Sequence, residues 1–186
     1  MKLEQSFEIA APLDVVWAAL VDVEFVAPCL PGAEISGRDD DGSYRGTFTV
    51  KLGPTTAAYN GVVRLEHVDE AAHTATLQAR GTDKRGQGGA TATIVNRVIA
   101  TEGGARVDAT TDLTITGRLA RFGRAGMIED ISNRMLRDFA NCLQDKLAQP
   151  AEATEPAVQP AAPVRGVSLF FSAFLGRLRR LFRRRS

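Results

Sequence analysis

The side chains that most often carry catalysis are sparse in this sequence and form no recognised catalytic or metal-binding motif. His67 and His73 lie on either side of an Asp69-Glu70 turn, and no cysteine or carboxylate cluster completes a metal site around them. The nucleophile motif Gly-x-Ser-x-Gly and the zinc motif His-Glu-x-x-His are both absent. We therefore interpret the histidines as surface residues and predict neither a catalytic residue nor a metal ion, although a single buried acid would leave no such motif.

Two further segments could bind ions but lack a necessary residue. The glycine-rich stretch from Gly81 to Gly89 starts like a phosphate-binding loop, but Gln87 stands where that motif needs the lysine that contacts the phosphates. We predict a glycine-rich hairpin there instead. The run from Asp39 to Gly42 has no partner base and is typical of a solvated turn.

The two cysteines, Cys29 and Cys142, are far apart in the sequence. A disulfide framework is usually built from more cysteines at closer spacings, so we predict a buried thiol at Cys142, on the apolar face of a helix. The N-terminal residues contain no apolar segment of the signal-peptide type, which favours a cytoplasmic location. No apolar run reaches the roughly 18 residues that a membrane-spanning helix needs.

Charge is divided unevenly along the chain, although composition is ordinary for a soluble globular protein, with 44% apolar and 24% charged residues. Residues 1–148 contain 16 Lys and Arg against 20 Asp and Glu, and residues 164–186 contain seven Arg and no acid. The formal net charge of +1 is therefore the sum of an acidic body and a basic end. This asymmetry indicates a membrane or nucleic-acid contact for the tail.

The periodicity of apolar residues predicts an α+β domain over residues 1–147. An alternating strand at 2–9 precedes two short helices, the first from Pro12 to Leu20 and the second capped by Asp22. Residues 33–118 read as about six strands of an antiparallel meander, in which the facing of 90–100 is not decided by the pattern. Residues 126–147 form a long amphipathic helix that should pack on the sheet.

The presumed inner face of this sheet carries many small residues. These are Gly46, Ala57, Gly61, Ala75, Ala79, Gly81, Ala109 and Thr111. Small side chains under a long helix leave a cavity unless larger neighbours pack against them, and both alternatives stay open. If a cavity exists, we expect its lining to be Trp17, Phe48, Tyr59, Leu77, Leu113, Ile131, Met135 and Phe139.

The C-terminal part of the chain divides into a linker and a second amphipathic segment. Residues 148–163 contain four prolines and predict a semi-rigid linker. Residues 164–186 predict a basic amphipathic helix that lies on an anionic membrane surface without crossing it. A partner's groove, nucleic acid and disorder are the alternatives. The membrane-binding residues would be Phe170, Phe171, Phe174, Leu178, Leu181 and Phe182 on the apolar side, and Arg177, Arg179, Arg180, Arg183, Arg184 and Arg185 on the basic side.

Several motifs together resemble the family of the carbon monoxide dehydrogenase G subunit, within the START-like (SRPBCC) helix-grip superfamily. The resemblance covers roughly residues 1–147. It is carried by Ala11-Pro12 with Val16-Trp17, by Cys29-Leu30-Pro31-Gly32-Ala33, by Lys51-Leu52-Gly53-Pro54 within 44–54, by residues 59–65, and by Gly117-Arg118-Leu119-Ala120-Arg121-Phe122-Gly123. It implies a helix-grip fold, in which a curved antiparallel sheet wraps a long C-terminal helix over an apolar cavity. It also implies association with a molybdenum hydroxylase of the carbon monoxide dehydrogenase type and a role in placing that enzyme at the membrane, but not that this chain binds molybdenum or flavin.

These observations lead to three hypotheses of function. The first is a non-catalytic accessory protein that binds a hydrophobic ligand, a quinone or a lipid, and links the hydroxylase to the inner face of the cytoplasmic membrane. It has no covalent or metal-bound cofactor and no nucleic-acid partner. The second is a membrane-recruitment or assembly factor without a ligand. The third is a cyclase- or hydratase-type enzyme, which would need an acid/base pair inside the cavity.

Overall fold

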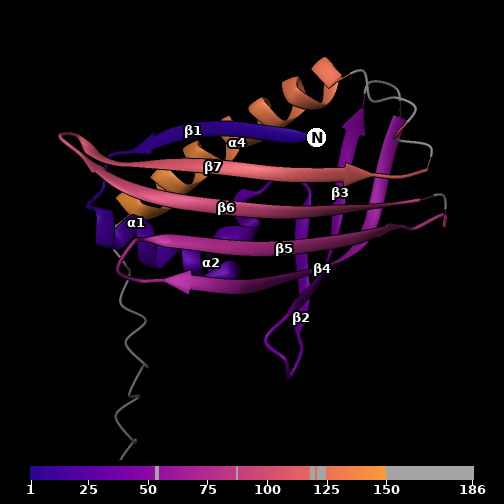
Figure 1. Cartoon of the computed structure of the whole chain (residues 1–186), viewed down its shortest axis with the longest axis horizontal. Coiled ribbons are helices and arrows are strands. Elements are labelled where there is room, and N and C mark those ends of the chain that lie inside the picture. The colour runs from indigo at the N-terminus through magenta and orange to yellow at the C-terminus, as the bar shows by residue number, and fades with distance from the viewer. Residues whose placement is uncertain (53–54, 87, 118–119, 121–124, 150–186) are drawn as a thin grey trace, which may run out of the picture. The chain divides into compact units, whose positions relative to one another are not determined.

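A computed structural model of the chain describes residues 1–52, 55–86, 88–117, 120 and 125–149 (Figure 1). All of them belong to one compact unit, residues 1–150. The predicted linker and basic amphipathic segment lie outside the described residues, apart from Ala148 and Gln149. In chain order the elements are β1 (Lys2–Ile9), α1 (Leu13–Val21), α2 (Val23–Val26), the short 3-10 helix η1 (Ala27–Cys29), β2 (Ala33–Arg38), β3 (Tyr44–Leu52), β4 (Thr55–Asp69), β5 (Thr74–Asp83), β6 (Gly89–Thr101), β7 (Gly104–Ile115) and α4 (Ala125–Ala148).

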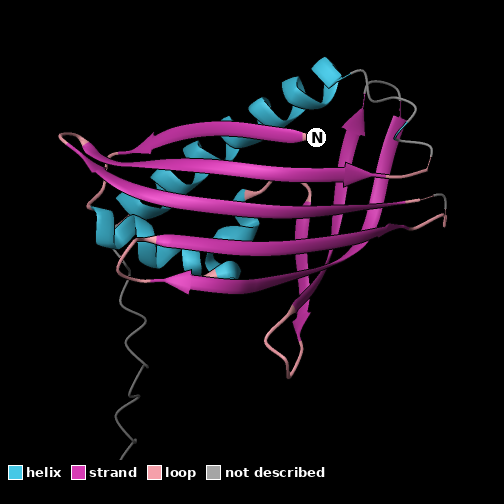
Figure 2. Cartoon of the chain, viewed as in Figure 1, coloured by secondary structure: helices cyan, strands magenta, loops and turns pink. Residues whose placement is uncertain are grey.

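The seven strands form one antiparallel sheet in the order β1-β7-β6-β5-β4-β3-β2 (Figure 2). Consecutive strands from β2 to β7 are neighbours, so the predicted meander is confirmed, and β1 closes the sheet by pairing with β7. The sheet is strongly curved: β2, β3 and the first part of β4 run across the direction of β5, β6 and β7, while α4 crosses one face diagonally (Figure 1). This arrangement confirms the predicted helix-grip architecture.

The segment between β1 and β2 follows its local sequence signals. Pro12 precedes the first turn of α1, and the carboxylate of Asp22 accepts a hydrogen bond of 3.0 Å from the backbone N–H of Phe25, which caps α2 as predicted. Gly32 then turns the chain into β2 with a φ of +83°. A Cβ at Gly32 would overlap the carbonyl oxygen of Thr49, so this position accepts no side chain.

The face of the sheet toward α4 is set by register, and we call it the inner face. Ala92 of β6 lies opposite Ala79 of β5 and Leu113 of β7. The alternation of the strand then directs Ala90, Ile94, Asn96 and Val98 inward as well, which settles the facing that the sequence left open. Both faces of β6 carry apolar residues, so hydrophobicity alone could not decide between them.

Packed side chains form two separate clusters on the inner face. The main cluster lies where α1 and the C-terminal half of α4 meet the sheet, and its most buried members are Ile9, Val16, Val107, Ala105 and Leu143. The second cluster surrounds Ala57 and Tyr59 of β4, with Phe48, Val50, Ala90 and Ile115 packed against them. The core therefore consists of two bodies of side chains at opposite ends of the same face.

Cys29 and Cys142 form a disulfide that joins η1 to α4, with their Cα atoms 5.3 Å apart. The prediction of a buried thiol at Cys142 is therefore wrong. Sequence spacing misled it, because the meander carries the chain away from η1 and α4 then returns to it. Within the part of the chain that the structure describes, no helix is both long and apolar enough to cross a membrane.

Candidate functional site

Between the two packed clusters lies a stretch of inner face whose apolar side chains remain partly exposed. Leu77 and Ile94 are cross-strand neighbours, and Ala79, Ala92 and Leu113 form the next row. All five are only half-buried, although α4 covers this side of the sheet. We call these five residues, with Gly61 and Gly81 in the following row, the inner trough. A filled core would bury such side chains almost completely, so part of their surface is not covered by packed neighbours.

Helix α4 covers this side of the sheet (Figure 1). Among the strands, β1 at the sheet's edge makes the most backbone contacts with it. Phe139 packs edge-on against Phe7 of β1, with ring centroids 5.9 Å apart. Ile131 and Met135, nearer the N-terminal end of the helix, are half-buried. The helix is thus held mainly by β1, and its C-terminal half packs into the main cluster with Ala75 of β5 and Val98 of β6.

A pair of amides borders the inner trough. The side-chain N–H of Gln5 donates a hydrogen bond of 2.6 Å to Oδ1 of Asn133 on α4. In the sheet, Gln5 lies opposite Ala109, which in turn lies opposite Asn96. Both Gln5 and Asn96 are half-buried on the inner face, so amide groups able to bind a ligand's polar atoms lie beside apolar ones.

The eight residues predicted to line a cavity all lie on the inner side, but they divide among its parts. Trp17 and Phe139 belong to the main cluster or pack against it. The indole N–H of Trp17 donates to the carboxylate of Glu70, and the ring stands edge-on to His73. Phe48 and Tyr59 are in the second cluster. Leu77 and Leu113 belong to the inner trough, with Ile131 and Met135 on α4, and the lining role of all eight stays a prediction.

Tyr59 is the titratable group at the far end of this face. Burial raises the pKa of its phenol because the charged form is desolvated, and the negative charge of Asp83 raises it further. Asp83 lies opposite Tyr59, but its carboxylate accepts a hydrogen bond of 2.8 Å from the backbone N–H of Arg85 and so stabilises the following turn. In this geometry the Asp83 carboxylate is held by the turn, so it is not placed to act as a base for the Tyr59 phenol.

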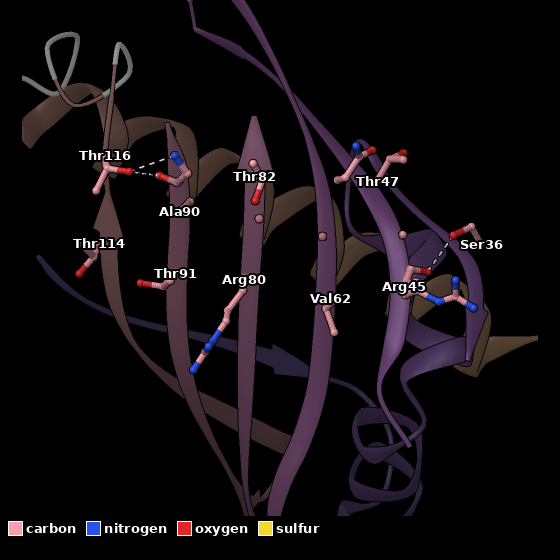
Figure 3. A pocket seen from close by; sticks show the side chains of 15 residues that line it. Ser36, Arg45, Thr47, Val62, Arg80, Thr82, Ala90, Thr91, Thr114 and Thr116 are labelled. Carbon is pink, nitrogen blue, oxygen red and sulfur yellow. Dashed lines mark hydrogen bonds between the residues drawn. The ribbon is translucent and has the colours of Figure 1, made fainter. Parts of the chain in front are cut away.

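A groove of about 610 Å³ lies on the opposite face, which we call the outer face (Figure 3). Apart from Ala90, its lining side chains alternate along their strands with the inner-face residues, so they point away from α4. Gly61 and Gly81 belong to both the inner trough and this lining, because glycine has no side chain on either face. The lining residues are Ser36, Arg45, Gly46, Thr47, Asn60, Gly61, Val62, Arg80, Gly81, Thr82, Gly89, Ala90, Thr91, Thr114 and Thr116. None of the predicted cavity residues lines this outer groove. Sequence reasoning missed it, although the strand alternation already placed Arg45 and Arg80 together on the polar side.

Two guanidinium groups lie in the outer groove, although more of its lining surface is apolar than polar. Arg45, Val62 and Arg80 are consecutive partners across β3, β4 and β5. Nε of Arg45 forms an ion pair of 2.8 Å with Asp39. At the other end, the hydroxyl of Thr116 accepts a hydrogen bond from the backbone N–H of Gly89 and donates one to its carbonyl oxygen. The groove can therefore offer hydrogen-bond donors and positive charge to a bound group.

Metal binding finds no support among the residues that the structure describes, where no group of three or more His, Cys, Asp or Glu side chains converges. His67 is exposed, as predicted for a surface residue. His73 is half-buried between Trp17 and Asp14, with 3.8 Å between its Nε2 and the Asp14 carboxylate, and so packs more closely than a surface residue. The back of α4 is solvated as predicted, since Glu129, Asp130, Arg134, Arg137 and Asp145 are all exposed.

Solved structures of several proteins share this fold. A conserved protein from Geobacillus kaustophilus superposes with a TM-score of 0.67 at 18% identity, over 80% of this chain and 95% of that one. The ZhuI aromatase/cyclase from a Streptomyces species gives 0.56 at 18% identity, over 83% and 98%. A START superfamily protein from Mycobacterium smegmatis gives 0.52 at 12% identity, over 78% and 96%. At these identities the likeness shows the fold alone.

Comparison at the sequence level is more specific. No curated protein matches the chain significantly. The sequence profile of CoxG, the G subunit of carbon monoxide dehydrogenase, however, matches residues 6–148, from the second half of β1 to the last residue of α4. That range includes the inner trough, Asn133 of the amide pair and the outer groove. The chain belongs to the CoxG family.

Proposed function

We propose that this chain is a non-catalytic accessory protein that binds a hydrophobic ligand, a quinone or a lipid, in the inner trough. The observation that carries the proposal is the incomplete burial of Leu77, Ile94 and Leu113, which lie in two neighbouring rows between the packed clusters. Leaving apolar surface open in the middle of a small domain costs stability unless something covers it. A chain-like apolar ligand would cover it.

The trough suits a molecule with a long apolar part and a small polar head. Burying each CH₂ group of such a molecule contributes about 0.8 kcal/mol, so few polar contacts are needed for binding. The amides of Gln5, Asn96 and Asn133 would receive the head, because carbonyl and hydroxyl oxygens pair readily with side-chain N–H groups. The apolar part would run along Leu77, Ile94 and Leu113 toward the second cluster, where the ring of Tyr59 lies against Gly81.

The remaining parts of the proposal concern partner and location. The family name supports a molybdenum hydroxylase of the carbon monoxide dehydrogenase type as partner. The pattern of residues 164–186 supports attachment to the inner face of the cytoplasmic membrane, since its apolar stripe and seven arginines suit an anionic lipid surface. The chain then brings ligand, enzyme and membrane together.

The ligand is tested on the full chain purified from its own membrane fraction, by native mass spectrometry and by organic extraction. We expect a co-purified quinone or lipid in the wild type and its loss in Met135→Trp, which fills the space above the inner trough. Arg134→Trp is the matched control, because it adds the same ring to the exposed back of α4. A wild type free of any hydrophobic molecule would contradict the ligand proposal.

The membrane contact needs a separate test. The full chain should co-sediment with vesicles containing phosphatidylglycerol, and the double variant Phe170→Glu/Phe174→Glu should not. Equal sedimentation of both proteins would exclude the apolar stripe as the anchor. If Met135→Trp loses the ligand but still recruits the hydroxylase to these vesicles, the chain is a recruitment factor in which the ligand has no part.

A further inference from the structure

We propose that the outer groove is a docking site for an acidic segment of a partner protein, in which an apolar residue lies between two carboxylates. The proposal does not depend on ligand binding in the inner trough, because the groove lies on the opposite face of the sheet. A protein segment docked outside would leave the inner face accessible. The chain could then hold a ligand and a partner at the same time.

The first argument is charge. Residues 1–148 contain more acidic than basic side chains, yet no carboxylate is among the residues that line the outer groove. Two arginines line it, and Arg80 forms no ion pair within the part of the chain that the structure describes. Arg45 is held at the edge by Asp39 through Nε, and 59% of its side chain remains exposed. An acidic body with a local basic groove is complementary to a partner's carboxylates.

The second argument is the spacing of the side chains. Val62 lies directly between Arg45 and Arg80 in one cross-strand row, and it is 41% exposed, unusually for a valine in the middle of a sheet. Neighbouring strands are about 4.8 Å apart, so the two arginine backbones are separated by about 10 Å. In an extended segment, residues i, i+2 and i+4 point to one side and span about 13 Å. The arginine side chains are long enough to bridge the difference between these two distances. The apolar residue i+2 of the segment would then lie over Val62.

The third argument distinguishes a protein segment from a small molecule. Small-molecule sites usually enclose most of their ligand, whereas Arg45 and Val62 remain widely exposed to solvent. The groove extends from β2 to β7, and hydroxyl groups of Thr47, Thr82 and Thr114 lie along it (Figure 3). An apolar centre with a polar rim is the usual anatomy of a protein interface, and hydroxyls suit the peptide groups of a docked chain.

The test is a titration of the ¹⁵N-labelled full chain with the peptide acetyl-Gly-Glu-Gly-Leu-Gly-Glu-Gly-amide at 150 mM NaCl. We expect amide shift changes centred on Arg45, Val62, Arg80 and Thr91, and no binding of the peptide with Gln in place of Glu. Arg80→Gln should weaken binding about tenfold, the effect of losing one charged hydrogen-bond partner. Arg97→Gln is the matched control, because it removes the same charge from the same face of the sheet, on β6 and outside the groove.

Three results would overturn the proposal. Equal weakening by Arg80→Gln and Arg97→Gln would mean that only the overall charge matters. Shifts confined to the arginines of residues 164–186 would mean that the peptide binds the basic tail. Inorganic phosphate or citrate that reproduces the groove shifts with equal affinity would mean a small-anion site. Because Arg80 is exposed, its replacement should leave the thermal unfolding midpoint unchanged, which keeps the comparison valid.

Discussion

Gln5 of β1 and Asn133 of α4 are joined by a side-chain hydrogen bond of 2.6 Å across the inner side of the sheet. Gln5 is the polar exception on a strand face that otherwise presents Leu3, Phe7 and Ile9. The pair connects the helix to the sheet's edge beside the inner trough. It therefore helps to set the distance between α4 and the middle strands.

Replacing one member of this pair should lower the free energy of unfolding more than replacing both. Asn133→Leu leaves the amide of Gln5 half-buried without its partner, which should lower the free energy of unfolding by about 1–2 kcal/mol. The double variant Gln5→Leu/Asn133→Leu should recover most of that loss. Urea unfolding followed by circular dichroism measures both, with the exposed Arg137→Ala as control. A double variant less stable than the single one would contradict this interpretation.

The Cys29–Cys142 disulfide should contribute about 3–5 kcal/mol to stability, because it closes a long loop in the unfolded chain. Dithiothreitol should lower the unfolding midpoint of the wild type and leave that of Cys29→Ser/Cys142→Ser unchanged. The denatured protein should show no free thiol until it is reduced. Two free thiols in freshly isolated protein would show that the bond does not form in the cell.

Two glycines of the same backbone conformation should respond very differently to substitution. Gly32 and Gly42 have φ of +83° and +82°. Nothing lies within 4 Å of a Cβ placed on Gly42, so Gly42→Ala should cost only the backbone term of about 1 kcal/mol. At Gly32 the added Cβ overlaps the carbonyl of Thr49, and we expect a loss of about 3 kcal/mol or more. Similar losses for both variants would show that the turn at Gly32 can shift away from β3.

Stability at alkaline pH should depend on Tyr59. Its folded-state pKa is raised by burial, so its contribution is complete below the ordinary tyrosine pKa of about 10 and is lost as pH rises through the folded value. Tyr59→Phe should therefore flatten the decline of unfolding free energy above pH 10. Absorbance at 295 nm should show that the variant has lost the tyrosine that titrates above the ordinary range. An unchanged alkaline titration would mean that the phenol is solvated.

Much of the fold could be predicted from local patterns. Alternation identified the strands because one face of each is buried, and the cap at Asp22 and the turn at Gly32 follow from backbone chemistry that a few residues determine. The facing of β6 could not be predicted, because Val95 and Ile99 on one side match Ile94 and Val98 on the other. Only pairing with β5 and β7 settles it.

The sites depended on contacts between distant segments, which periodicity does not report. Gln5 and Asn133 meet only because β1 closes the sheet beside α4, and Cys29 meets Cys142 for the same kind of reason. The outer groove needed the register that sets Arg45, Val62 and Arg80 in one row. Periodicity did identify the inner face of most strands, since the alternation of apolar and polar residues is a local property of each strand.

The disulfide also changes how the domain would yield to mechanical force. When the two chain ends are pulled apart, the force acts on Cys29 from the N-terminal side and on Cys142 from the C-terminal side. The disulfide transmits this force directly between them, so the chain segment that contains β2 to β7 is bypassed. While it is intact, the 113-residue separation between the cysteines cannot extend. Reduction would release about 400 Å of hidden contour length, at about 3.5 Å per residue. An oxidised domain tethered by its C-terminal end would therefore behave as a short, stiff link.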